Sequence, residues 1–263
     1  MTSSAAGRAA ATSAPSGAAA LADLLAASER AVVLTGAGIS VPSGIPDFRS
    51  PGTGVWEGVD PMEVAHVDAW RHDPETFWRF YGERFAMLVD KRPNPAHEAI
   101  AALERDGRIR AVITQNVDRL HRAAGTERLL EIHGSIQWSI CPRCGGRTGI
   151  ERVVELLEAG DGPPLCGDCA VALKPDVVLF GEMLALDTMA EAERLARQAD
   201  LMVCVGSSLV VHPAAGLPAL TLDGGGTLAL VTQGETPYDG EAAVKLDGDV
   251  VTELTAVVRA LGH

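Results

Sequence analysis

The sequence predicts an α/β fold, in which a Rossmann-type, doubly wound parallel sheet carries a smaller inserted lobe. Short apolar runs recur along the 263-residue chain. They are apolar on both faces, which is typical of parallel strands covered by helices on each side. Helical periodicity occupies several of the segments between these runs. Two stretches, about residues 51–93 and 138–175, break the alternation and are expected to form the smaller lobe.

The expected elements begin with a helical pattern from Leu21 to Ser28, followed by an apolar, β-branched run at Ala31–Thr35. That run stops at Gly36-Ala37-Gly38, which predicts a strand leading into a glycine turn. The first insertion is rich in aromatic residues and helical in pattern. Further strands are expected at Arg110–Thr114, Val177–Phe180, Leu201–Gly206 and Thr227–Val231, and helices at Pro95–Arg105 and Thr188–Ala199.

The domain plan follows from composition and from these interruptions. Residues 1–18 are mostly Ala, Ser, Gly and Thr and lack the strongly apolar segment of a secretory signal, so we expect a disordered tail. Residues 19–263 are expected to form one domain, whose large lobe comprises about residues 19–50, 94–137 and 176–263. Ligands of open α/β sheets bind outside the carboxyl ends of the strands, so a site is expected between the sheet and the insertions.

The charge of the chain narrows the classes of partner. Lys and Arg number 22 and Asp and Glu 35, which gives a net charge of -13. This charge repels phosphate backbones, so direct binding to nucleic acid is not expected, and cationic, lysine-bearing proteins or peptides fit better. No apolar run reaches the length of about 18 residues that crosses a bilayer. We therefore expect a soluble, cytoplasmic protein that does not bind membranes.

Four of the five cysteines form two close pairs, Cys141 with Cys144 and Cys166 with Cys169. Two C-x2-C pairs supply four thiolates, which complete a tetrahedral zinc shell with no open position for water. Disulfides or redox dithiols are the alternative, but a chain without a secretion signal stays reduced. We expect one structural zinc ion at these four residues. Cys204, inside an apolar run, is expected to be a core residue.

The turn Gly36-Ala37-Gly38 is suited to binding a phosphate, because glycine permits positive φ and leaves backbone amides unobstructed. The next glycine is Gly44, so the spacing departs from G-x-G-x-x-G and a purely structural turn is an equal alternative. Beyond the turn, Asp47-Phe48-Arg49 places an acid, an aromatic and a base in one loop. Such a loop can fold over a bound dinucleotide, although mixed charge is also common in ordinary surface loops.

Polar side chains cluster at the carboxyl end of the next expected strand, where Gln115, Asn116 and Asp118 follow an apolar run. Such groups match the one acceptor and two donors of a primary carboxamide. A helix N-cap explains one of them but does not require all three. His133 lies just before the cysteine-rich insertion. A structural role is the usual one for a lone histidine, but this position favours a general base.

Two further segments complete the set of motifs. A late strand ends in Gly206-Ser207-Ser208, where glycine and hydroxyls are suited to phosphate or ribose contacts. The segment Asp176–Glu182 is extended and apolar, and a core strand is its simplest interpretation.

Taken in this order, the motifs resemble those of the sirtuins of bacterial type, a family of NAD-dependent protein-lysine deacylases. The resemblance covers the chain from about residue 25 to the C-terminus. Each motif is modest by itself, and their ordered combination is specific. The segments that carry it are Gly36–Ser40, Gly44–Arg49, Thr114–Asp118, His133-Gly134, the two cysteine pairs, Phe180–Glu182 and Gly206–Ser208.

The resemblance implies a role for each segment. His133 would be the general base, with Asn116 and Asp118 as further catalytic residues. Val178 and Phe180 would line an acyl-lysine tunnel, and a substrate peptide would lie as a strand between the segments around Gly181 and Val211. NAD would be bound by Gly36, Ala37, Gly38, Asp47, Phe48, Arg49, Gln115, Asn116, Asp118, Gly206, Ser207, Ser208 and Thr232.

The implied reaction removes an acyl group, acetyl first, from a protein lysine. The acyl oxygen attacks the anomeric carbon of NAD as nicotinamide leaves, and His133 then deprotonates a ribose hydroxyl that attacks the resulting imidate. The products are free lysine, nicotinamide and O-acyl-ADP-ribose. The chain departs from the family in two places: Thr232-Gln233 replaces an Asn near the adenosine, and Leu184-Ala185 replaces a proline after the Phe-Gly-Glu loop.

Alternative functions remain open. Mono-ADP-ribosyl transfer uses the same cofactor cleavage, and a non-catalytic NAD-binding or zinc-ribbon module has no need of His133. Tyr81 and Arg84 fall on one face of an expected helix, where a phenol and a guanidinium can bind a carboxylate. Their Y-x-x-R pattern resembles sirtuins that remove succinyl and malonyl groups, whereas Val41–Gly44 resembles deacetylases. The simpler alternative is a packed Tyr81 and a solvated Arg84.

Overall fold

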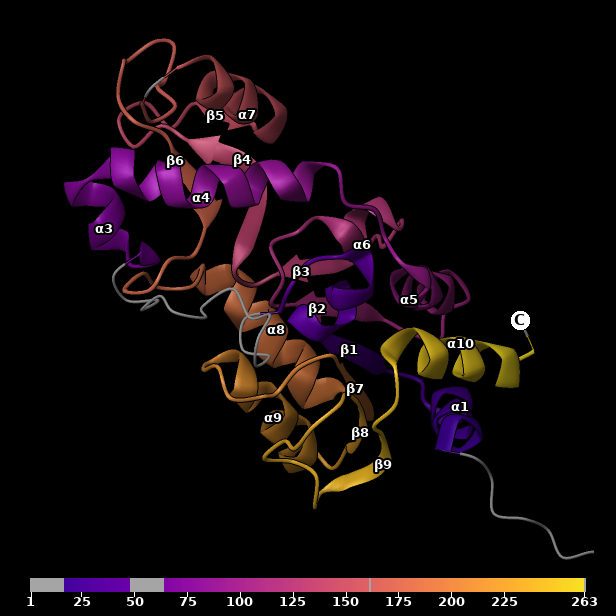
Figure 1. The fold of residues 1–263 in the computed structure, drawn as a ribbon. Helices are drawn as coiled ribbons and strands as arrows, with labels where there is room; N and C mark the ends of the chain where they lie inside the picture. The colour runs from indigo at the N-terminus through magenta and orange to yellow at the C-terminus, as the bar shows by residue number, and fades with distance from the viewer. Residues whose placement is uncertain (1–16, 48–63, 161, 263) are drawn as a thin grey trace, which may run out of the picture.

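The computed structural model describes residues 17–47, 64–160 and 162–262. A six-stranded sheet forms the large lobe, in the order β3-β2-β1-β7-β8-β9, and its neighbouring strands pair in parallel (Figure 1). The strand order reverses between β1 and β7, which is where open α/β sheets bind ligands. The strands are β1 (Ala31–Thr35), β2 (Ala111–Thr114), β3 (Leu129–Glu131), β7 (Leu201–Val205), β8 (Thr227–Val231) and β9 (Ala242–Leu246).

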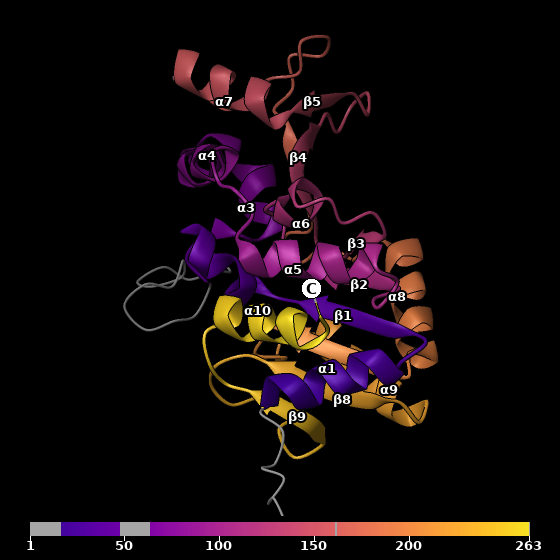
Figure 2. The same cartoon turned by 90° about the vertical axis from the view of Figure 1, so that its right-hand side faces the viewer.

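Helices cover both faces of this sheet (Figures 1 and 2). All five residues of β1 are buried, because Val33 faces one apolar cluster while Val32 and Leu34 face the other. This two-sided burial explains why the strands read as continuous apolar runs. The first face is covered by α1 (Gly17–Ala27), α5 (Pro95–Arg105) and α10 (Val250–Ala260), and the second by α8 (Leu186–Gln198), η2 (Ala214–Gly216) and α9 (Leu217–Asp223).

The smaller lobe has its own sheet, a three-stranded antiparallel one in the order β5-β4-β6. Its core joins aromatic side chains of the helical insertion to this sheet. The indole N–H groups of Trp70 and Trp78 both donate to the carbonyl of Leu173, at 3.0 and 2.8 Å, and so fasten the insertion to the chain before β6. The elements are α3 (Val67–His72), α4 (Pro74–Val89), β4 (Gly134–Ile140), β5 (Arg147–Gly149), α7 (Ile150–Ala159) and β6 (Lys174–Val177).

The predicted fold class is confirmed, but one predicted strand is wrong. The run Val177–Phe180 is not a strand of the parallel sheet: β6 ends at Val177 and belongs to the small antiparallel sheet. Val177 and Leu179 are apolar because they enter the small-lobe core, while Phe180 is 44% exposed. Two sheet strands, β3 and β9, were not predicted, since they are only partly buried edge strands and β9 contains Lys245.

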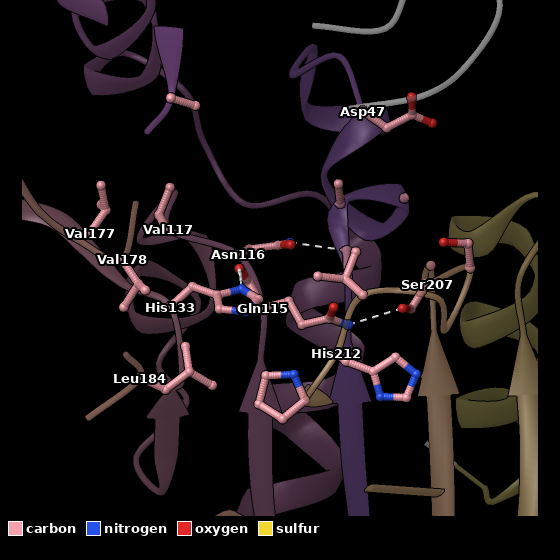
Figure 3. Close-up of a pocket in the computed structure, with 18 of the residues that line it drawn as sticks. Asp47, Gln115, Asn116, Val117, His133, Val177, Val178, Leu184, Ser207 and His212 are labelled. Atoms are coloured by element: carbon pink, nitrogen blue, oxygen red, sulfur yellow. Dashed lines mark hydrogen bonds between the residues drawn. The ribbon is translucent and has the colours of Figure 1, made fainter. Parts of the chain in front are cut away.

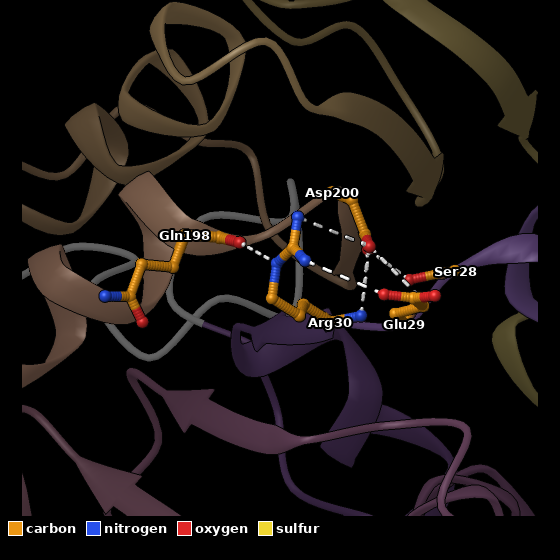
Figure 4. Close-up of polar contacts among 5 residues, drawn as sticks. All are labelled: Ser28, Glu29, Arg30, Gln198 and Asp200. Atoms are coloured by element: carbon orange, nitrogen blue, oxygen red, sulfur yellow. Dashed lines mark hydrogen bonds and ion pairs between the residues drawn. The ribbon is translucent and has the colours of Figure 1, made fainter.

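The ends of the large lobe are fastened by polar contacts. Of the expected tail at residues 1–18, residues 1–16 lie outside the described part, and Gly17 and Ala18 open helix α1. At the amino end of β7, the Asp200 carboxylate accepts from the Ser28 hydroxyl and, at 3.0 Å, from the backbone amides of Glu29 and Arg30 (Figure 4). This carboxylate ties the α1–β1 connection to the start of β7.

Among the described residues, no helix is long and apolar enough to cross a membrane.

Candidate active site

A cavity of about 980 Å³ opens at the carboxyl ends of the parallel strands, between the two lobes (Figure 3). Residues that directly follow four neighbouring strands line it: Gly36 after β1, Gln115 after β2, Gly206 after β7 and Thr232 after β8. These strands flank the point where the strand order reverses. The cavity therefore has the position expected of a dinucleotide site in this fold class.

The glycines of the first turn permit a close approach between two chain segments. Gly38 N–H donates to the carbonyl of Gly206 at 2.8 Å. A Cβ on Gly38 would lie 2.8 Å from the Gly206 backbone, and Gly206 itself has φ of 60°, where a Cβ would lie 2.3 Å from the Ile39 nitrogen. The glycines thus leave the floor of the cavity as bare backbone, which a phosphate group can approach.

Two polar side chains close this floor. The Gln115 side-chain amide donates to Ser207 Oγ at 2.9 Å and so bridges the ends of β2 and β7 (Figure 3). The 3₁₀ helix η1 (Ala37–Ser43) follows the glycine turn, and Asp47 beyond it also lines the cavity. Ser208, predicted with Ser207, lines it too. Phe48 and Arg49, predicted for the same site, lie outside the described residues.

A buried hydrogen-bond chain holds the amide of Asn116. Its Nδ2 donates to Gly36 O and to Ser40 Oγ, both at 3.1 Å, and the Ser40 hydroxyl donates to Asp118 Oδ2 at 2.5 Å. Asp118 also accepts from Leu120 N–H at 2.9 Å. Asn116 lines the cavity, whereas Asp118 is not among its lining residues and reaches Asn116 through Ser40. Burial raises the pKa of Asp118, against the opposing effect of the Ser40 hydrogen bond.

His133 lines the cavity beside Gln115 and Asn116, in the connection between β3 and β4 (Figure 3). Its Nδ1 is 2.9 Å from the backbone carbonyl of Gln115. A carbonyl oxygen only accepts, so Nδ1 carries the proton and the lone pair of neutral His133 is on Nε2. Burial lowers the pKa of His133, partly offset by the hydrogen bond to Gln115. A neutral imidazole at pH 7 is the form that a general base requires.

Two further histidines, His97 and His121, form a pair beneath the strand ends. His121 Nε2 is 2.9 Å from the hydroxyl of Thr35, which donates to Thr114 Oγ1 at 2.8 Å. The rings of His97 and His121 pack edge to face, with centroids 4.9 Å apart. Burial lowers the pKa of His97 to about 4 and that of His121 to about 3. Neither residue lines the cavity, so both belong to the support of the site.

The residues predicted to contact substrate separate into two groups. Val178, Phe180, Gly181, Val211 and Tyr81 line the cavity. Arg84 is not among the lining residues: its guanidinium carbon lies 3.6 Å from the centre of the Phe80 ring, and its Nη1 donates to the Phe80 carbonyl at 2.7 Å. Tyr81 packs between Phe77 and Phe85, and burial raises its pKa.

Several residues that line the cavity were not predicted from the sequence. Gly248, Asp249 and Val250 reach the cavity at the start of α10, far along the chain from every motif. They follow the edge strand β9, and recognising that strand is the signal that would have pointed to them. His212, Met183 and Met189 also line the cavity. His212 directly follows Val211 and Met183 directly follows the segment Phe180–Glu182, so extending these two motifs by one residue would have found them, whereas Met189, within α8, reaches the site only through the fold.

The four paired cysteines converge at one point of the small lobe. The sulfur atoms of Cys141, Cys144, Cys166 and Cys169 all lie within 4.8 Å of one another, and none is in a disulfide. The Cys144 and Cys166 sulfurs are 3.8 Å apart. Tetrahedral coordination with Zn–S bonds of about 2.3 Å places sulfurs at about that separation. The cluster therefore fits one zinc ion with a closed shell, as predicted, and it is remote from His133 in the fold.

The family model and the relatives of known sequence point to the same family. The Sir2 family model matches residues 36–213. An NAD-dependent protein deacetylase of Thermotoga maritima is 46% identical over 229 residues, which cover 87% of this chain and 92% of the relative. The chain belongs to the Sir2 family. An NAD-dependent protein deacetylase of Haloarcula marismortui is also 46% identical, over 92% of this chain and 94% of its own length.

Solved structures of sirtuins have the same fold. A Sir2 structure with a p53 peptide and NAD+ superposes with a TM-score of 0.84 at 44% identity, covering 91% of this chain and 96% of that one. Sir2 bound to a propionylated peptide gives 0.83 at 44% identity, with the same coverage. Sir2 with a deacetylated p53 peptide and 3'-O-acetyl ADP ribose gives 0.87 at 44% identity. The predicted membership of the sirtuins is confirmed.

The family match in this sirtuin begins at Gly36, the first residue of the glycine turn, and ends at Pro213 in the cavity wall. It therefore includes the small lobe and most of the cavity. Thr232, Gln233 and Asp249 lie beyond it but line the same cavity. The sirtuin fold thus completes its site with the C-terminal strands and helix.

Proposed function

We propose that this sirtuin removes acyl groups, acetyl first, from protein lysines in an NAD-dependent reaction that yields nicotinamide, free lysine and O-acyl-ADP-ribose. The observation that carries the proposal is the position of His133, whose Nε2 lone pair is available at the cavity where the glycine turn and Asn116 meet. The named activities of the relatives, and the peptide, NAD+ and acetyl ADP ribose complexes of similar structures, support it.

The residues of the cavity suit the cofactor. When bound, NAD supplies a glycosidic bond to a positively charged leaving group, and the protein mainly has to orient the reacting groups and exclude water. The backbone floor at Gly36, Gly38 and Gly206 suits the phosphates. Asn116 is held by Ser40 and Gly36, so its amide is fixed before any ligand arrives. We assign the carboxamide contacts to Asn116 and Asp47, and the positioning of Asn116 to Asp118.

The wall that His133 shares with the small lobe suits the acylated lysine. Val178 and Phe180 would provide apolar surface for the lysine stem and acyl group, and the backbone around Gly181 and Val211, which lines the same cavity, would pair with a peptide. Pairing through the main chain tolerates many peptide sequences. His133, neutral at pH 7, takes the proton of a ribose hydroxyl in the later step of the reaction.

Two further points belong to this proposal. The net charge of -13 favours cationic, lysine-bearing protein segments as substrates. Four thiolates ligating zinc require reduced cysteines, which the cytoplasm maintains, and we place the enzyme there.

Desuccinylation is a weaker candidate, because Arg84 is held over Phe80 and not at the cavity wall.

The test is product analysis. Purified protein, NAD and an acetylated lysine peptide are expected to yield deacetylated peptide, nicotinamide and O-acetyl-ADP-ribose in equal amounts by mass spectrometry. Transfer of ADP-ribose to a protein or peptide, with the acetyl group retained, would instead identify a mono-ADP-ribosyltransferase. Binding of NAD without any turnover on a panel of acylated peptides would contradict both.

A further inference from the structure

The segment Leu179–Glu182, which we name the cleft turn, forms a tight turn at the cavity. Glu182 N–H donates to the Leu179 carbonyl at 3.0 Å, and Gly181 in the third position has φ of 82°. That φ strains any residue with a side chain, so the glycine is required by the turn. Phe180, Gly181 and Glu182 all line the cavity. Movement of this turn would therefore change the surface that a peptide meets.

A single ammonium group ties the cleft turn to the small lobe. Lys174 Nζ, at the start of β6, lies 2.8 Å from Glu182 Oε2 and donates to the carbonyls of Val177 at 2.8 Å and Pro175 at 3.1 Å. An ammonium has three protons, and these three partners use them all. Glu182 Oε2 also accepts from Leu179 N–H at 2.9 Å. One carboxylate oxygen thus joins both ends of the turn to Lys174.

Burial makes this ion pair more effective than those on the surface. The side chains of Lys174 and Glu182 are only 20% and 24% exposed, whereas those of the Arg152–Glu155 pair in the same lobe are 61% and 63% exposed. Salt and water screen an exposed pair, and its contribution is small. Loss of one partner of a partly buried pair leaves the other charge poorly compensated. Removing Lys174 therefore acts directly on the Glu182 end of the turn.

The other end of the turn has independent anchors. Phe180 N–H donates to the Ala65 carbonyl and Val67 N–H to the Phe180 carbonyl, both at 2.9 Å. Val178 N–H donates to the His133 carbonyl at 2.8 Å. These backbone bonds fix Val178 and Phe180 without Lys174. The Lys174–Glu182 pair is thus the side-chain contact that sets the second half of the turn.

We infer that Lys174 is a positioning residue for the acylated peptide: through Glu182 it holds the cleft turn in the conformation that receives the substrate backbone. The inference rests on the proposed deacylase function. Lys174 lies on β6 in the small lobe, whereas the floor assigned to NAD follows β1 and β7 in the large lobe. Lys174 therefore controls peptide affinity and does not touch NAD or the reacting atoms.

The experiment compares zinc-loaded wild type with Lys174→Met, which keeps the length of the side chain but removes its charge and donors. Loss of a charge-assisted hydrogen bond is expected to raise the KM and Kd for one acetylated peptide about tenfold. The KM for NAD should stay within about twofold and kcat within about threefold, because neither depends on this bond. Lys174→Arg, which keeps charge and donors, should recover most of the lost affinity. Arg152→Met is the matched control and should bind peptide like wild type.

Zinc content and thermal unfolding are measured for every variant, and Glu182→Gln provides a second route if Lys174→Met loses zinc. The glutamine keeps an acceptor for Leu179 N–H but removes the charge, so peptide Kd should rise again, by less. Unchanged peptide affinity in a folded Lys174→Met protein, or equal losses for NAD and peptide, would overturn the inference while wild-type turnover upholds the proposed function. A wild type that neither binds nor deacylates the peptide would overturn both.

Discussion

Ser40 Oγ lies 2.5 Å from Asp118 Oδ2 and joins a buried carboxylate to the amide of a residue in the cavity wall. Asp118 accepts from two donors, the Ser40 hydroxyl and Leu120 N–H. Asparagine has a single side-chain acceptor, so Asp118→Asn must leave one of these donors facing an N–H group. The expected cost in the free energy of unfolding is about 2 kcal/mol.

Because Asn116 is held through Ser40, Asp118→Asn should also lower kcat for deacetylation, by about tenfold or more. Urea unfolding and steady-state kinetics check the two effects. Asp73→Asn is the control, since Asp73 caps α4 and asparagine caps a helix equally well. Full activity in the Asp118→Asn variant would show that Asp118 does not help to position Asn116.

His133→Ala is expected to abolish deacetylation and leave the fold intact. The residue is only half-buried, at the edge between the two sheets, so its loss creates little cavity. A base of this kind contributes about a hundredfold to ten-thousandfold in rate. Turnover is measured at saturating NAD, with circular dichroism to confirm the fold. Near wild-type kcat in a folded His133→Ala protein would refute the role.

Removal of zinc is expected to unfold the small lobe, because a closed four-sulfur site contributes folding free energy directly. Metal analysis should find one zinc per chain in the wild type and none in Cys166→Ser. Peptide deacetylation should be lost with the metal. Cys204→Ala is the matched control: Cys204 is buried in the large sheet, so this variant should keep its zinc. Equal zinc content in both variants would contradict the assignment.

The buried histidines predict a loss of stability in mild acid. Burial holds the pKa of His97 at about 4 and that of His121 at about 3, below the value of 6.5 for an exposed histidine. As pH falls below 6.5, the unfolded chain takes up protons that the folded chain does not. The free energy of unfolding should therefore be unaffected by these groups above about pH 6.5. Between pH 6 and 4 it should fall by up to about 1.4 kcal/mol per pH unit for each histidine.

His97→Gln isolates this effect, since glutamine also serves in the third position of a capping box, where His97 now accepts from Asn94 N–H. The variant should have a shallower dependence of unfolding free energy on pH, by about 1.4 kcal/mol per pH unit. Zinc release at low pH affects both proteins alike and cancels in the difference. Identical slopes for the two proteins would show that His97 titrates normally.

Arg84→Met tests acyl selectivity. Since the Arg84 guanidinium is held over Phe80, we expect kcat/KM on acetyl and succinyl forms of one peptide to change by less than about threefold. Their ratio should not change. Selective loss of desuccinylation would show instead that the guanidinium turns into the cavity and binds the carboxylate of the acyl group.

The sequence was sufficient for the fold class because the strands of the parallel sheet are buried on both faces, and it was sufficient for the zinc site because ligand spacing is visible in the chain. It misplaced Val177–Phe180, since a run is equally apolar whether it enters the large core or the small one. Ser40, Lys174 and Asp249 were given no role for a different reason. Asp118 is 78 residues from Ser40, Lys174 reaches Glu182 only through the turn of the chain after β6, and Asp249 reaches the cavity only because β9 joins the sheet, so these positions become visible only once the chain is folded.

The position of His133 also bears on motion. β3 of the large sheet ends at Glu131 and β4 of the small sheet begins at Gly134, so His133 lies in the short connection between the two sheets. Gly134 is confined there, since a Cβ would lie 2.2 Å from the Asp176 carbonyl. Residues near the axis of a rotation move little. A closing rotation of the small lobe about this connection would therefore narrow the cavity while His133, the proposed base, keeps its distance from the floor that we assign to NAD.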